Sequence, residues 1–167
     1  VIACCDSRVH PPALMGSQPG EMFVIRNVAN LVPPYSPHNE HASVAAALEF
    51  AVLSLNVGRI IVMGHSGCGG IQALLRRSTP ADSALTRWLA IAEPARELTY
   101  RHHAGASATV QARQCEQGSV HTATKSAHIS RKTCSASGGK PTIWTSRPAP
   151  RTSVRMLFLK ATHPWAA

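Results

Sequence analysis

Three short runs of continuous apolar residues stand out in the first part of the chain. They cover residues 1–5 (Val-Ile-Ala-Cys-Cys), 22–25 (Met-Phe-Val-Ile) and 60–63 (Ile-Ile-Val-Met). Apolar runs of this length, without polar alternation, are typical of strands buried on both faces. Between the second and third runs, residues 39–56 carry an apolar stripe at helical spacing and predict a helix that ends before Gly58. The stripe consists of Val44, Leu48, Ala51, Val52 and Leu55.

A helix that leads directly into another buried strand predicts a crossover between parallel strands. The expected fold is therefore α/β, a mainly parallel β-sheet flanked by helices, with an irregular basic C-terminal tail. Residues 11–16 predict a short helical turn that ends at glycine, and a further helix should start near Asp82 and break before Pro94. The polar pair Arg26-Asn27 is expected to form a turn after the second strand.

The positive charge is concentrated at the end of the chain. The formal net charge is +9, but all eight acidic residues lie between Asp6 and Glu116, where nine arginines balance them. Eight further Lys and Arg residues follow Gln117 without any acid. We therefore expect a domain over 1–117 and a basic tail over 118–167 that is disordered or translated out of frame. Only residues 154–159 of this tail could form a strand or a helical turn.

Composition narrows the class of protein. No run of 18 apolar residues could cross a membrane, and the tail has neither aromatic interleaving nor a recognition helix that would indicate nucleic-acid binding. Five cysteines, two of them adjacent, do not resemble a secreted disulfide framework and predict a reducing compartment, here the cytoplasm. Because the chain opens directly in an apolar run, we expect it to begin inside a strand.

Side chains that suit chemistry follow the first predicted strand. If the chain stays extended there, Cys4, Asp6 and Arg8 share one side and Cys5 faces the other. Alone, these residues are equally consistent with a buried cysteine and an ordinary Asp–Arg ion pair.

The segment His65-Ser-Gly-Cys68-Gly-Gly follows the third predicted strand. Because the carboxyl ends of parallel strands meet at one edge of a sheet, His65 and Cys68 should lie near Cys4. Two thiolates and one imidazole suit Zn²⁺, and three protein ligands leave a fourth position for water or for Asp6. Asp6 could then orient a zinc-activated water, while Arg8 keeps Asp6 ionised and away from the metal.

Three motifs in this order resemble the β-class carbonic anhydrases over approximately residues 1–117. They are Cys-x-Asp-Ser-Arg (4–8), Arg-Asn-x-x-Asn (26–30) and Gly-His-x-Gly-Cys-Gly-Gly (64–70). The resemblance implies that Cys4, His65 and Cys68 bind zinc and that Asp6 and Arg8 form a catalytic dyad. The implied reaction is the reversible hydration of CO₂ to bicarbonate and a proton, so the expected partner is a small-molecule substrate.

The same resemblance implies a homodimer or higher oligomer, although the N-terminal helical arm that grips a partner subunit in this family is expected to be absent. Two alternatives stay open: hydrolysis of carbon disulfide or carbonyl sulfide at the same site, and a non-catalytic zinc-binding remnant in which Asp6 fills the fourth position. A second zinc site drawn from Cys115, His121, His128 and Cys134 fits no compact ligand spacing and is not predicted.

Overall fold

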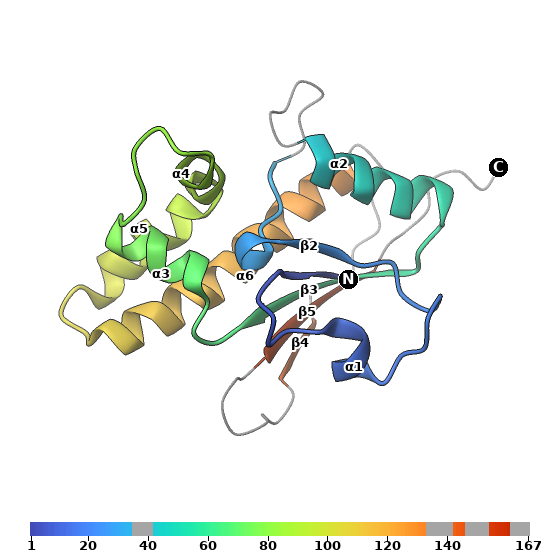
Figure 1. Ribbon diagram of the computed structural model, residues 1–167, viewed down its shortest axis with the longest axis horizontal. Coiled ribbons are helices and arrows are strands. Elements are labelled where there is room, and N and C mark those ends of the chain that lie inside the picture. Colours follow the sequence, from blue (N-terminus) through green and yellow to red (C-terminus); the bar gives the residue numbers. More distant parts are fainter. Residues whose placement is uncertain (35–41, 133–141, 146–153, 161–167) are drawn as a thin grey trace.

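A five-stranded sheet forms the centre of the protein in the computed structural model, which describes residues 1–34, 42–132, 142–145 and 154–160. The strand order is β2-β1-β3-β5-β4 (Figure 1). The strands are β1 (Ile2–Cys4), β2 (Ile25–Asn27), β3 (Arg59–His65), β4 (Thr142–Thr145) and β5 (Val154–Lys160). β1 pairs in parallel with both β2 and β3, whereas β5 pairs antiparallel with β3 and with β4. The α/β fold with a parallel core is confirmed.

The helices are α1 (Pro11–Met15), α2 (Ala42–Glu49), α3 (Gly69–Arg76), α4 (Ala84–Leu89), α5 (Glu93–His103) and α6 (Ala108–Lys132). Short turns of 3₁₀ helix cover Val28–Asn30 and Ala90–Ala92, and a π-helical turn over Phe50–Ser54 extends α2. The predicted helix over 39–56 is thus confirmed over residues 42–54, and its first three residues lie outside the described ranges. The predicted short turn ends as expected, with Gly16 in the left-handed conformation at φ 66°.

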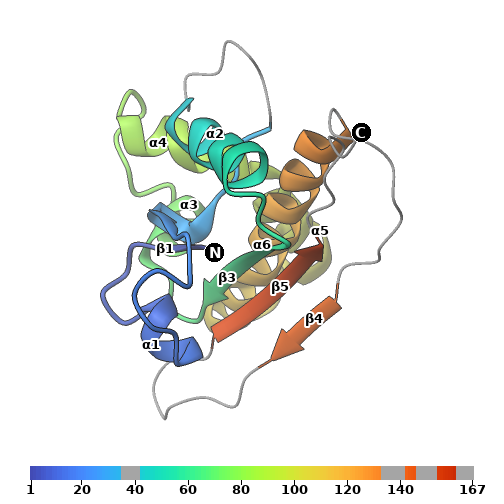
Figure 2. The same cartoon turned by 90° about the vertical axis from the view of Figure 1, so that its right-hand side faces the viewer.

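Alternation along the strands divides the core into layers. Ile2 and Val62 pack on one face of the sheet with residues of α2 and α6, whereas Ala3 and Met63 pack on the other face with Met15 of α1. Both views place α1 and α2 on opposite sides of the first strands (Figures 1 and 2). A third cluster joins α3, α4, α5 and α6 at the carboxyl ends of β1 and β3. This cluster is where the candidate site lies.

The second strand differs from its prediction. It was expected over 22–25, but β2 covers Ile25–Asn27, so Arg26 and Asn27 lie in a strand and not in a turn. The reason is pairing: β2 lies in register with the three residues of β1, with Ile25 opposite Ile2 and Asn27 opposite Cys4. The N-terminal amine of Val1 donates to the carbonyl of Phe23 just before this ladder, 2.7 Å away.

The boundary predicted at residue 117 falls inside α6, which runs to Lys132. Ser119, Val120 and Ala123 are buried against the core, and an added Cβ at Gly118 would lie 3.1 Å from the Cβ of Ala95 on α5. Gly118 lets α6 approach α5 closely, and Val120 and Ala123 pack against the sheet residues Ile2 and Val62. The polar composition of the segment gave no sign of this packing. β5 coincides with the one segment of the tail where an element was expected. No element was expected over Thr142–Thr145, where β4 pairs with β5, so that part of the prediction is wrong. Disorder of the tail outside the described residues and its out-of-frame origin stay predictions.

No helix in the described ranges combines the length and the apolar character that a membrane span requires.

Candidate metal centre

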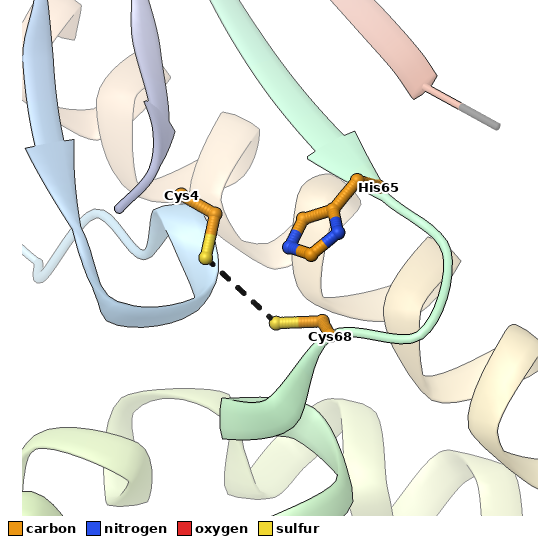
Figure 3. A group of neighbouring side chains, drawn as sticks. All are labelled: Cys4, His65 and Cys68. Atoms are coloured by element: carbon orange, nitrogen blue, oxygen red, sulfur yellow. Dashed lines mark hydrogen bonds between the residues drawn. The ribbon is translucent and has the colours of Figure 1, made fainter. Parts of the chain in front are cut away.

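Three donor side chains converge where β1 and β3 end. Cys4 is the last residue of β1 and His65 the last residue of β3, and the two strands are parallel neighbours. A tight turn then brings Cys68 back toward them, at the start of α3 (Figure 3). The donor atoms of Cys4, His65 and Cys68 all lie within 4.8 Å of one another, and all three residues are buried. The convergence predicted from the strand ends is therefore present in the structure.

The donor set fits zinc. The sulfurs of Cys4 and Cys68 are 4.0 Å apart, close to the roughly 3.8 Å expected for two thiolates on one tetrahedral zinc ion. Nδ1 of His65 lies 3.1 Å from the carbonyl oxygen of Ser66, which can only accept, so Nδ1 carries the proton and donates. Nε2 of His65 is buried and has no hydrogen-bond partner among the described residues. A buried nitrogen lone pair beside two thiols is the arrangement that a metal ion would satisfy.

The pKa values of the three donor side chains are shifted by one another and by burial. The hydrogen bond from the Cys68 thiol lowers the pKa of Cys4, and the same contact, together with burial, raises the pKa of Cys68. Burial lowers the pKa of His65, but the adjacent Cys4 sulfur and the negative charge of Asp6 outweigh it, so the net pKa of His65 is raised. The hydrogen bond between the two sulfurs therefore favours the thiolate form of Cys4, and a bound metal ion would displace the remaining thiol proton.

Asp6 and Arg8 form a two-pronged ion pair next to this group. Arg8 donates from Nε to Oδ1 at 2.9 Å and from Nη2 to Oδ2 at 2.7 Å, and its backbone N–H also donates to Oδ1. These bonds hold the pKa of Asp6 far below its usual range. Oδ2 of Asp6 lies 4.0 Å from Nε2 of His65. The carboxylate is thus ionised and beside the three donors, although it is not one of the group.

A guanidinium from β2 holds the loop that carries Asp6. Arg26 donates to the carbonyl of Cys4 at 2.9 Å, to that of Asp6 at 2.8 Å and to that of Val9 at 2.7 Å. Sequence reasoning identified Arg26 as part of a motif but gave it no role. Its function follows from the tertiary position of β2 beside β1, which no local pattern reveals.

Other candidate residues lie apart from the site. Cys5 is exposed, in agreement with the predicted alternation. Cys115 is fully buried in the cluster between the helices, where burial raises the pKa of its thiol to about 11. The side chains of His121 and His128, and all of Cys134, lie outside the described residues, so the structure adds nothing to that discarded site.

Comparisons with known proteins agree with this arrangement. A family model described as carbonic anhydrase matches residues 1–137. Two curated proteins of Arabidopsis thaliana are similar over 123 residues, or 72% of this chain: β carbonic anhydrase 5, chloroplastic (45% identical), and β carbonic anhydrase 6, mitochondrial (46%). The match spans 40% and 42% of those proteins, so this chain corresponds to about two fifths of their length.

Solved structures show the same likeness. The β-carbonic anhydrase CcaA superposes with a TM-score of 0.71 at 32% identity, covering 79% of this chain and 66% of that one. A tetrameric β-carbonic anhydrase of Sordaria macrospora gives a TM-score of 0.60 at 27% identity, covering 74% and 60%. The α/β fold and the buried Cys-His-Cys group together define a zinc-binding protein of the α/β class. With the family match, the chain belongs to the β-carbonic anhydrases, which use zinc.

The predicted cytoplasmic location is wrong. The two Arabidopsis relatives are chloroplastic and mitochondrial proteins, which points to organelles. The prediction rested on free cysteines, and free thiols indicate a reducing compartment without distinguishing the cytosol from the interior of an organelle.

Proposed function

We propose that this chain carries the catalytic centre of a carbonate dehydratase, which interconverts CO₂ with bicarbonate and a proton. The observation that supports the proposal most directly is the buried group of Cys4, His65 and Cys68 with the Asp6–Arg8 pair beside it. A purely structural zinc site would use four protein ligands, whereas this group offers three.

Cys4, His65 and Cys68 would hold the zinc ion. When bound, zinc supplies a Lewis acid that lowers the pKa of water enough to make it a nucleophile near neutral pH. Asp6 is placed to accept a hydrogen bond from that nucleophile, because its Oδ2 lies 4.0 Å from the His65 ring nitrogen that faces the thiols. Arg8 keeps the carboxylate ionised and fixes its direction through two parallel hydrogen bonds.

The pairing with Arg8 also argues against the remnant alternative. In that alternative Asp6 fills the fourth metal position, which would require its carboxylate to give up the two-pronged contact. Neither the described contacts nor the comparisons favour carbon disulfide or carbonyl sulfide as substrate. We also propose that the chain assembles into a homodimer or a larger oligomer, as the tetrameric Sordaria proteins do.

Stopped-flow CO₂ hydration on zinc-loaded protein tests the function. We expect Asp6→Ala to lower kcat by about 10²-fold or more, the usual effect of losing a group that handles protons. Asp82→Ala is the matched control, because Asp82 is an exposed aspartate that does not belong to the metal centre. Turnover no faster than free zinc, in wild-type protein that holds one equivalent of metal, would contradict the proposal.

A further inference from the structure

One peptide group in the metal loop is held from both sides by opposite charges. The carbonyl of Gly67 accepts from Nη2 of Arg8 at 3.0 Å, and the N–H of Cys68 donates to Oε1 of Glu116 at 3.0 Å. These two atoms belong to the same peptide bond, and the C=O and N–H of a trans peptide point in opposite directions. The cation therefore meets the negative end of the peptide dipole and the anion meets the positive end.

This peptide controls where the Cys68 sulfur lies. It immediately precedes the Cα of Cys68, and Cys68 is the residue from which α3 starts. Gly67 has a φ of 67°, a left-handed conformation that other residues adopt rarely, so the turn depends on both the glycine and its hydrogen bonds. Without these hydrogen bonds the backbone at Gly67 and Cys68 could change conformation, and the Cys68 sulfur, now 4.0 Å from that of Cys4, would move with it (Figure 3).

Glu116 reaches the peptide from a helix whose own position is fixed. Its neighbours Cys115 and Ser119 on α6 are buried to 0% and 1% exposure, and Val120 of the same helix contacts Gly64, the residue before His65. The Glu116 carboxylate is itself half-buried. Burial raises its pKa, and hydrogen bonds from the backbone N–H groups of Cys68 and Gly67 oppose that change. α6 therefore presents a partly desolvated acceptor to the loop.

We propose that Glu116 is a positioning residue of the metal centre, which fixes the Cys68 sulfur through the Gly67–Cys68 peptide. At the other end of the same peptide it steadies Arg8, and so the direction of Asp6. The proposal rests on the proposed function, because it needs a metal at Cys4, His65 and Cys68. It gives α6, 48 residues away from Cys68 at the point of contact, a direct part in the site.

The test compares Glu116→Ala with Glu116→Gln in full-length protein loaded with Co²⁺ in place of zinc. Transfer of Co²⁺ to a chelator and the visible absorption spectrum of bound Co²⁺ are the two readouts. We expect Glu116→Ala to release metal about 10–100-fold faster, with a changed spectrum, as for other groups that orient metal ligands. Glu116→Gln keeps an acceptor oxygen and should restore the spectrum. Glu97→Ala, which removes an exposed glutamate of α5, should behave as wild type.

Wild-type release rate and spectrum in Glu116→Ala would overturn this inference and leave the proposed function intact. Failure of the wild-type protein itself to take up Co²⁺ would instead overturn the proposed function. If Glu116→Ala does not fold, the amide proton of Cys68 decides between the outcomes by NMR. Loss of the carboxylate charge in Glu116→Gln should move its resonance upfield, and an unchanged resonance would contradict the contact.

Discussion

Two adjacent glycines at the start of α3 give a sharp test of how the metal loop packs. An added Cβ at Gly70 would lie 2.7 Å from Cγ1 of Val28 and 3.1 Å from the Cβ of Ala29. The same atom added at Gly69 would meet nothing within 4 Å. Val28 is β-branched and stiff, and Ala29 has a left-handed φ of 62°, so neither neighbour moves aside easily.

The expected energies follow from these contacts. Replacing glycine by alanine in a helix stabilises by up to about 1 kcal/mol, and at Gly69 nothing opposes that gain. At Gly70, overpacking of this kind costs about 1–3 kcal/mol. The helix contribution is common to both variants, so Gly70→Ala should be less stable than Gly69→Ala by about 1–3 kcal/mol.

Urea unfolding of the two variants, followed by circular dichroism, measures this difference from the midpoints and slopes. Because Gly70 follows Cys68 by two residues, Gly70→Ala should also release metal faster than Gly69→Ala. A Gly70→Ala protein as stable as Gly69→Ala would refute the close approach of α3 to the turn over Val28–Asn30.

Three further predictions concern the surroundings of the site. Arg26→Ala removes donors to three carbonyls of the loop that carries Asp6, so urea unfolding should show a free energy of unfolding lower by about 1–3 kcal/mol. Unchanged stability would mean that these three hydrogen bonds do not hold the loop. Trp88→Phe leaves the carbonyl of Val28 without its 2.8 Å donor and should cost about 1–2 kcal/mol by the same measurement; a neutral effect would mean that the bond adds nothing. Burial raises the pKa of Cys115 to about 11, so the stability it contributes is complete below about pH 8.5, the unfolded value, and is lost as pH rises toward 11. The free energy of unfolding, measured from pH 8 to 11, should therefore decline more steeply in wild type than in Cys115→Ala. Parallel pH profiles would contradict the burial of the Cys115 thiol.

The parts of the site that sequence reasoning could locate are those set by strand periodicity. The apolar runs over 1–5 and 60–63 predicted two parallel strands whose carboxyl ends meet at one edge. The two residues between His65 and Cys68 predicted a turn back toward that edge. Both expectations are met because β1 and β3 are neighbours in the sheet. The order of the motifs then sufficed to indicate the family.

The supporting residues were beyond sequence reasoning because tertiary packing places them. Nothing near Glu116 signals that its carboxylate reaches a backbone N–H 48 residues earlier. The left-handed φ of Ala29 has no local signal either, since alanine seldom adopts it. The Asn27 side chain imposes that turn by bonding both the N–H and the carbonyl of Leu31, at 2.8 and 2.9 Å. Likewise, α6 continues past residue 117 because Ser119 and Ala123 are buried against the rest of the protein. The polar composition of the segment does not indicate this burial.

X-ray absorption spectroscopy of the zinc-loaded protein tests the central claim most directly. The account predicts two sulfur ligands at about 2.3 Å, with the remaining ligands nitrogen or oxygen at about 2.0–2.1 Å. Cys68→Ser should reduce the sulfur count to one. A wild-type zinc environment with fewer than two sulfurs, or one that is the same in Cys68→Ser, would contradict the assignment of Cys4, His65 and Cys68 as the metal ligands.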